Sequence, residues 1–296
     1  MSKASPPPAR SFGQVADAYD RARPSYPDEA VGWLTGSGRS FVLELGAGTG
    51  KLTEVLDRSG HTVLATDPLP EMLAHLGRRV QVEHVAATAE RIPLRSRSVD
   101  LVVCGQSFHW FDHDLAMAEI ARVLRPGGVL ALVWNTYDTS IPWVRRLEKL
   151  LMRPDDGDRA FALKESPYFG FVEEKSFRFW QVHTARTLAD LARSVSRVAT
   201  MRETERDELL AQVDALYADY GRGHDGMQLP WVTRCYRSVV RHSELPPEAP
   251  APDERRQTSA TGDDIAPPGL EDDTEATGPV VRRPPEDPGM QLIDFK

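Results

Sequence analysis

The sequence has few cysteines and no long apolar segment. Its two cysteines, Cys104 and Cys235, form no CxxC pair, so buried reduced thiols are expected rather than a disulfide framework or a thiolate metal site. No apolar run approaches the ~18 residues of a membrane-spanning helix. Residues 1–10 are rich in proline and lack the apolar region of a secretory signal. These absences predict a cytoplasmic protein.

The main part of the chain also lacks an excess of basic residues. Of the net charge of −8, residues 246–296 contribute −7, and they hold 10 of the 23 prolines. The rest is nearly neutral, which argues against a nucleic-acid partner. We expect the tail 246–296 to be disordered, because a segment so poor in apolar residues cannot bury a core. An interaction tail is the alternative interpretation.

Glycine, by contrast, is concentrated in one turn. The apolar run Phe41–Leu45 is followed by Gly46, Gly48 and Gly50, and apolar residues then return at helical spacing. This pattern predicts a buried strand, a tight turn and a helix. Glycines allow positive φ and close approach of a ligand to the backbone, and the start of a helix offers free N–H groups. The turn is therefore a candidate ligand cradle.

The glycine spacing fits neither of two phosphate-binding motifs. A dinucleotide fingerprint would require glycine where Lys51 stands, and a P-loop would require Ser or Thr where Leu52 stands. Glu44, two residues before Gly46, suits a ligand with a cationic amino end. S-adenosylmethionine has an ammonium and a sulfonium but no phosphate.

A second carboxylate ends the next predicted strand, residues 61–67. In nucleotide-binding βαβ units, an acid about 20 residues beyond the glycines bonds the ribose hydroxyls, and Asp67 fits that role. Capping of the helix that follows Pro68 is an alternative that is compatible with it.

The ordered motifs resemble those of class I S-adenosylmethionine-dependent methyltransferases. The resemblance rests on residues 44–50, Asp67, 99–103 and 124–128, and it covers roughly residues 11–136 well and 137–242 loosely. Segments 12–16, 19–24 and 108–112 are similar to the small-molecule branch that includes trans-aconitate methyltransferase-like and ubiquinone-biosynthesis-like enzymes. The resemblance implies an α/β fold with a doubly wound, Rossmann-like, seven-stranded sheet, mostly parallel with one antiparallel strand near the C-terminal edge. S-adenosyl-L-methionine is the implied cofactor.

Four regions are expected along the chain: an N-terminal arm and lid helix (1–36), a cofactor-binding core (37–136), a substrate cap that also completes the sheet (137–245), and the tail (246–296). The lid helix is predicted from the apolar stripe of Phe12, Val15, Ala16 and Tyr19, with packing on the core as the alternative. The apolar pattern also predicts a fifth strand over 129–134 and a helix over 187–198.

The resemblance also implies how the cofactor is held. Pro68, Leu69 and Met72 would line the adenine pocket, with core filling as the alternative for Met72. Thr88 stands where relatives often carry Asp, and its hydroxyl can accept the same bond, while the backbone N–H of Ala89 would contact the adenine ring. The cofactor-binding residues expected in full are Glu44, Gly46, Ala47, Gly48, Gly50, Asp67, Pro68, Met72, Thr88, Ala89, Glu90 and Gln106.

The acceptor side rests on aromatic and basic residues. The resemblance implies that Tyr19 and Arg23 face the site. The candidates for a dry acceptor pocket are Phe108, Trp110, Trp134 and Trp143, with core packing as the alternative. If the acceptor is a hydroxyl or an amine, His109 is the best candidate for a general base; a carboxylate needs none. A histidine that bonds the backbone and orients its loop is the alternative.

No metal is expected. His109 and His113 are four residues apart, but no third ligand follows at a recognisable spacing. The predicted activity is methyl transfer from S-adenosylmethionine to a small molecule with a carboxylate, hydroxyl or amine acceptor, by in-line displacement. Two other classes stay open: an NAD-linked oxidoreductase, which the missing third glycine opposes, and a non-catalytic cofactor-binding or scaffold protein.

Overall fold

The computed structural model describes residues 22–152, 157–221 and 226–241. The predicted lid helix from Phe12 to Tyr19 and the tail 246–296 lie outside the described residues. Within the described ranges, no helix is both long and apolar enough to cross a membrane.

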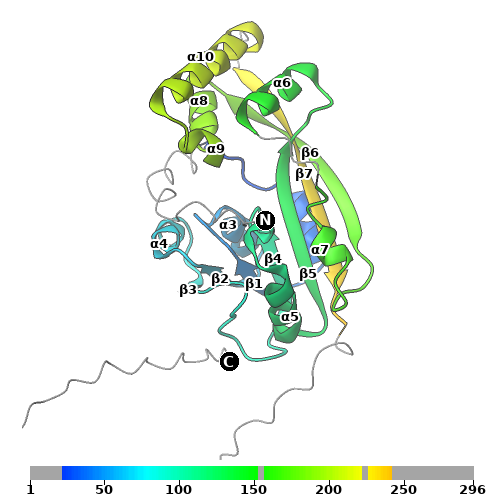
Figure 1. Ribbon diagram of the computed structural model, residues 1–296. Helices are drawn as coiled ribbons and strands as arrows, with labels where there is room; N and C mark the ends of the chain where they lie inside the picture. Colours follow the sequence, from blue (N-terminus) through cyan, green and yellow to red (C-terminus); the bar gives the residue numbers. More distant parts are fainter. Residues whose placement is uncertain (1–21, 153–156, 222–225, 242–296) are drawn as a thin grey trace, which may run out of the picture. The chain divides into compact units, whose positions relative to one another are not determined.

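The described strands form one seven-stranded sheet, in the order β3-β2-β1-β4-β5-β7-β6 (Figure 1). β7 runs antiparallel to both of its neighbours, and the remaining neighbours pair in parallel. This confirms the predicted mostly parallel sheet with one antiparallel strand near the C-terminal edge. The strands are β1 (Phe41–Leu45), β2 (Thr62–Asp67), β3 (Glu83–Ala86), β4 (Val99–Gly105), β5 (Leu124–Tyr137), β6 (Glu173–His183) and β7 (Met227–Val239).

Two predicted elements differ in length or continuity. The fifth strand extends past the predicted 129–134 to Tyr137, because β7 pairs with it as far as Tyr137 and Trp231. The helix predicted over 187–198 is interrupted at Ser194, whose hydroxyl donates to the carbonyl of Leu191 at 2.7 Å and competes with the helical backbone. The helices are α2 (Asp28–Thr35), α3 (Lys51–Arg58), α4 (Pro70–Arg79), η1 (Phe108–Trp110), α5 (His113–Val123), α6 (Pro142–Leu151), α7 (Phe161–Lys164), α8 (Ala185–Arg193), α9 (Ser196–Ala199) and α10 (Glu203–Tyr220).

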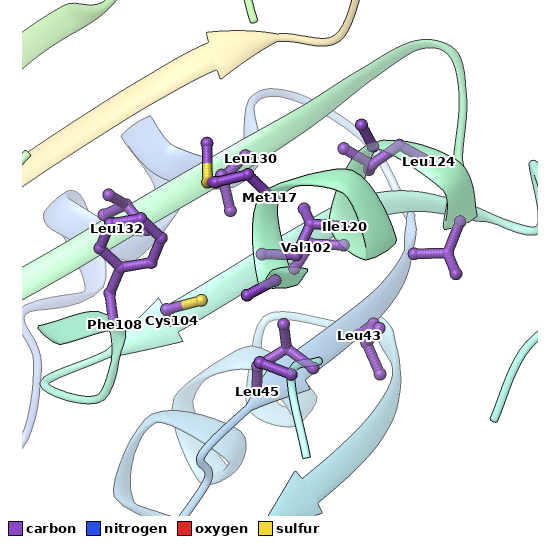
Figure 2. Close-up of a cluster of buried hydrophobic side chains, with 14 of the residues drawn as sticks. Leu43, Leu45, Val102, Cys104, Phe108, Met117, Ile120, Leu124, Leu130 and Leu132 are labelled. Atoms are coloured by element: carbon purple, nitrogen blue, oxygen red, sulfur yellow. The ribbon is translucent and has the colours of Figure 1, made fainter. Parts of the chain in front are cut away.

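Alternation along the strands separates the two faces of the sheet. In β1, Leu43 and Leu45 point to one face, and Val42 and Glu44 point to the other. Leu43 and Leu45 pack with side chains of α5 in the cluster of Figure 2, so we call this side the α5 face. Val42 packs with side chains of α2 and α3, and we call this side the α3 face. Near-continuous apolar strands thus bury both faces, as parallel sheets require.

Helices α6, α8, α9 and α10 form a second layer, which we call the cap. Their apolar side chains pack against Tyr137, Leu229 and Trp231 at the ends of β5 and β7 (Figure 1). The sequence that follows β5 therefore builds a cap next to the carboxyl edge of the sheet, where ligands of doubly wound sheets bind.

Candidate functional site

The glycine turn leaves β1 at the carboxyl edge of the sheet, with all three glycines at positive φ: 71° at Gly46, 57° at Gly48 and 84° at Gly50. At Gly46 an added Cβ would lie 2.4 Å from the Cβ of Ser107, so only glycine fits there. At Gly48 an added Cβ would meet no atom within 4 Å. The turn is therefore tightly packed at its base and open at Gly48, as a backbone cradle for a ligand would be.

Asp67 ties this turn to the end of β2. Its Oδ2 accepts a hydrogen bond from the N–H of Gly48 at 2.9 Å, and its Oδ1 accepts one from the N–H of Leu69 at 2.9 Å. Leu69 is the N-cap residue of α4 and no side-chain hydrogen bond caps that helix, so Asp67 orders the turn before α4 and does not cap the helix. Burial raises the pKa of this carboxyl, and the two backbone hydrogen bonds act against that rise. A carboxylate oxygen can accept further bonds, so Asp67 keeps acceptor capacity for a ligand hydroxyl.

Glu44 lies beneath the turn, on the α3 face, and is 1% exposed. Its Oε2 accepts a hydrogen bond of 2.6 Å from the hydroxyl of Thr53 on α3. Burial raises the pKa of Glu44 to about 8, the Thr53 hydrogen bond lowers it, and the nearby charge of Asp67 raises it further. The carboxyl is thus largely protonated at neutral pH. A cation in the cradle would favour its ionised form.

The residues expected around adenine lie beyond the ends of β2 and β3. Pro68 is exposed and Met72 is half-buried, at the start of α4. Thr88 is exposed, and its carbonyl accepts the N–H of Arg91 at 3.2 Å. Ala89 is buried. Glu90 Oε1 accepts the N–H of Asp112 at 2.9 Å, so Glu90 connects this segment to the loop before α5. None of these placements tests a contact with adenine, which stays a prediction.

The end of β4 is strained and tightly held. Gln106 has a φ of 61°, one of two non-glycine residues with positive φ in the described ranges. Its N–H donates to the carbonyl of Val133 at 2.9 Å, and its side chain donates to the carbonyl of Asn135 at 3.1 Å. The hydroxyl of Ser107 donates to the carbonyl of Leu45 at 2.6 Å. Such strain persists only where neighbours enforce it, and it is commonly found at functional sites.

The loop after β4 places His109 and Trp110 at the surface. Both lie in η1, their rings are 4.8 Å apart, and Trp110 is 55% exposed. His113 instead turns inward, stacks on Phe108 and bonds the carbonyl of Phe108 through Nε2 at 3.0 Å. His113 thus bonds the backbone and helps to orient this loop, while the role of His109 stays a prediction. No cluster of three metal-ligating side chains forms in the part of the chain that the structure describes.

The three predicted tryptophans do not come together. Trp134 is fully buried on the α5 face, where its ring contacts those of Phe108 and Tyr236. Trp143 on α6 stacks on Tyr220 at 5.7 Å within the cap. This placement favours the core-packing interpretation for Trp134, and it leaves Trp110 at the open end of the sheet.

Arg23 precedes α2, in a segment that runs between the sheet and the cap. Its Nε donates to the hydroxyl of Ser194 at 3.0 Å. The carbonyl of Ala22 accepts the side-chain amide of Gln181 at 3.1 Å, and that of Ser25 accepts the amide of Asn135 at 3.1 Å. This segment therefore joins the cap to β5 and β6. Tyr19, predicted beside Arg23, lies outside the described residues.

Sequence reasoning missed Asn135 and Tyr137, because the fifth strand was expected to end at residue 134. The alternation Ala131, Val133, Asn135, Tyr137 continues the α3 face past that limit. Extending the period of two by three residues would have found both side chains at the carboxyl edge.

Comparisons with known proteins agree with this architecture. Residues 43–132 match the family described as a methyltransferase domain. Over 233 residues the chain is 42% identical to an uncharacterized methyltransferase of Mycobacterium tuberculosis, a match that covers 78% of this chain and 96% of the relative.

Two further similarities are narrower. Over 144 residues the chain is 35% identical to the malonyl-[acyl-carrier protein] O-methyltransferase of Enterobacter lignolyticus. This match covers 45% of this chain and 57% of that enzyme. A solved structure from Anaeromyxobacter dehalogenans, provisionally assigned as a type II methyltransferase, superimposes with a TM-score of 0.53 at 24% identity and covers 76% of this chain and 99% of that one. At this identity the superposition supports the fold alone.

Proposed function

The chain belongs to the class I S-adenosylmethionine-dependent methyltransferases, and on that premise we propose that it methylates an oxygen of a small molecule by in-line displacement. The observation that carries the proposal is the arrangement at the carboxyl edge of the sheet. The open turn at Gly48, the carboxylate of Asp67 and the strained end of β4 at Gln106 lie next to a cap built over β5 and β7.

The proposed cofactor contacts follow from the geometry of the turn. The backbone of Gly46 to Gly48 would hold the methionine end of S-adenosylmethionine, with Glu44 as the acid nearest its ammonium. The remaining acceptor capacity of Asp67 suits the ribose hydroxyls. Pro68, Met72, Thr88 and Ala89 would surround the adenine. The bound cofactor supplies a methyl group on a sulfonium.

The contribution of the protein to the chemistry is mainly alignment. Holding the acceptor oxygen in line with the methyl–sulfur bond converts a bimolecular reaction into an effectively unimolecular one. An anionic oxygen and a sulfonium neutralise each other as they react, so a site without water favours the transfer. A carboxylate acceptor requires no general base; for a hydroxyl acceptor, His109 on η1 would serve as the base. The name of the relative from Enterobacter lignolyticus, an O-methyltransferase, supports an oxygen acceptor.

The near-neutral charge of the chain outside the tail supports a small acceptor over a nucleic acid. The test uses S-adenosylmethionine carrying a labelled methyl group, incubated with the protein and a total cell extract. After ultrafiltration, label in organic-extractable small molecules supports the proposal. Label retained on protein or nucleic acid contradicts it. Gly48→Val is the matched control, because it should abolish cofactor binding.

A further inference from the structure

Buried polar atoms without partners gather on one face of the sheet. Eight buried side-chain nitrogen or oxygen atoms in the described ranges have no hydrogen-bond partner. Five of these belong to Tyr137, Gln181, His183 and Trp231, although the backbone N–H of Thr187 lies near enough to His183 to raise the pKa of its ring against the effect of burial. A buried donor or acceptor left unpaired is destabilising, so a native fold rarely concentrates several of them without a reason.

The strand register places these residues together. Tyr137 of β5 and Phe179 of β6 both pair with Trp231 of β7, so their side chains share the α3 face. The rings of Tyr137 and Trp231 stack at 4.5 Å, and those of Phe179 and Trp231 at 6.4 Å. Gln181 and His183 follow Phe179 at alternate positions and therefore point the same way. We call Tyr137, Gln181, His183 and Trp231 the polar patch.

The polar patch adjoins the proposed cofactor site. Asn135 lies two residues before Tyr137 on the same face. Its backbone carbonyl accepts a hydrogen bond from the side-chain amide of Gln106. Its own amide oxygen accepts the hydroxyl of Thr233 at 2.7 Å. A continuous line of contacts thus leads from the end of β4 to Tyr137. A head group bound at the patch would lie on the acceptor side of the cofactor.

The donors of the patch favour an anionic oxygen, whereas the amide oxygen of Gln181 is an acceptor and does not help to hold it. The hydroxyl of Tyr137 and the indole N–H of Trp231 are donors, and their side chains are 7% and 1% exposed. Burial raises the pKa of Tyr137 to about 12, so the hydroxyl keeps its proton. The positive charge of Arg23 acts on this hydroxyl more strongly than the negative charge of Glu148. Burial lowers the pKa of His183 to about 4, so its ring is neutral.

The surroundings favour an apolar body attached to that head. Leu188 and Val213 of the cap and Met227 and Leu229 of β7 lie with Trp231 in one apolar cluster. Because removal of apolar surface from water is favourable, an aliphatic chain would be stabilised here. These polar atoms are buried, so a head group can reach them only when the packing around them opens.

We propose that the methyl acceptor is an amphipathic carboxylate whose head binds Tyr137, Trp231 and Arg23, with its apolar body beneath the cap. This inference rests on the proposed function. A carboxylate oxygen attacks the methyl carbon, an O–CH₃ bond forms as the S–CH₃ bond breaks, and the bonding electron pair stays on sulfur. The products are a methyl ester and S-adenosylhomocysteine, and no proton is transferred.

The test compares three probes with the same chain length, octanoate, octan-1-ol and octylamine, by calorimetry on protein saturated with S-adenosylhomocysteine. Octanoate should bind at least tenfold more tightly than the other two. Tyr137→Phe should weaken octanoate binding about ten- to a hundredfold, the scale for a hydrogen bond to a charged group. Tyr220→Phe removes a hydroxyl from an exposed tyrosine in the cap and should change nothing.

Two further measurements distinguish a failure of this inference from a failure of the proposed function. With S-adenosylmethionine, the protein should form methyl octanoate, detectable by mass spectrometry. The carboxylate inference is wrong if octanoate binds no better than octan-1-ol, or if Tyr137→Phe leaves the affinity for octanoate unchanged. The methyltransferase proposal still stands in that case, provided that S-adenosylhomocysteine binds and the extract yields a labelled small molecule. If S-adenosylhomocysteine does not bind the wild-type protein, the proposed function itself fails.

Discussion

Replacement of Glu44 by Gln should remove a pH dependence of stability that the structure makes unusually large. The carboxyl is enclosed between β1 and α3, accepts one hydrogen bond from Thr53, and has a pKa of about 8 against an ordinary value of 4.5. Glutamine keeps the shape and can still accept the Thr53 hydroxyl, but it does not titrate. The comparison therefore isolates the ionisation of one buried group.

The sign and the size follow from proton linkage. Between pH 4.5 and about 8 the folded protein holds a proton on Glu44 that the unfolded chain has released. The wild-type free energy of unfolding therefore falls by about 1.4 kcal/mol for each pH unit in this window, and levels off above the folded pKa. Relative to Glu44→Gln, the wild-type protein should lose about 2 kcal/mol between pH 6 and pH 8.

Urea unfolding of both proteins at pH 6, 7 and 8 measures this difference. The lowered pKa values of His61 and His183 give stability that rises with pH up to about 6.5, but both histidines are present in both proteins and cancel. Glu71→Gln, an exposed substitution on α4, is the matched control and should follow the wild-type curve. If wild type and Glu44→Gln show parallel pH dependence, Glu44 is ionised in the folded protein and the argument fails.

Three further substitutions test the turn. Gly48→Val should abolish S-adenosylhomocysteine binding, because the added side chain enters the open space of the cradle and disfavours the φ of 57° there. Circular dichroism separates a local loss of the site from a loss of the fold. Normal binding by a folded variant would show that the turn has only a structural role. Gly46→Ala should lower the melting temperature by several degrees, because the added Cβ would meet the side chain of Ser107. Ser107→Gly in the same chain should restore part of that loss. If it restores nothing, the strain comes from the positive φ alone and not from the contact with Ser107. Asp67→Ala should weaken S-adenosylhomocysteine binding by about 1–3 kcal/mol. It should also destabilise the fold, because two backbone N–H groups lose their acceptor. Unchanged affinity in calorimetry would contradict the assignment of Asp67 to the ribose.

The local elements of the cofactor half could be predicted from the sequence by itself. The run Phe41–Leu45, the alternate glycines and the apolar spacing that follows specify strand, turn and helix within about fifteen neighbouring residues, and the structure confirms β1 and α3 there. Asp67 at the end of β2 follows in the same way. Such patterns suffice because φ preferences and hydrophobic periodicity are properties of adjacent residues.

Tertiary structure alone decided which of these residues meet. Ser107 makes a Cβ at Gly46 unfavourable although 61 positions separate the two residues, and Tyr137 faces Trp231 only because β5 and β7 pair in one register. A shift of that register by one residue would exchange Trp134 and Tyr137 between the two faces of the sheet. The register is set by the packing of both faces over the whole sheet, and no short stretch of sequence contains that information.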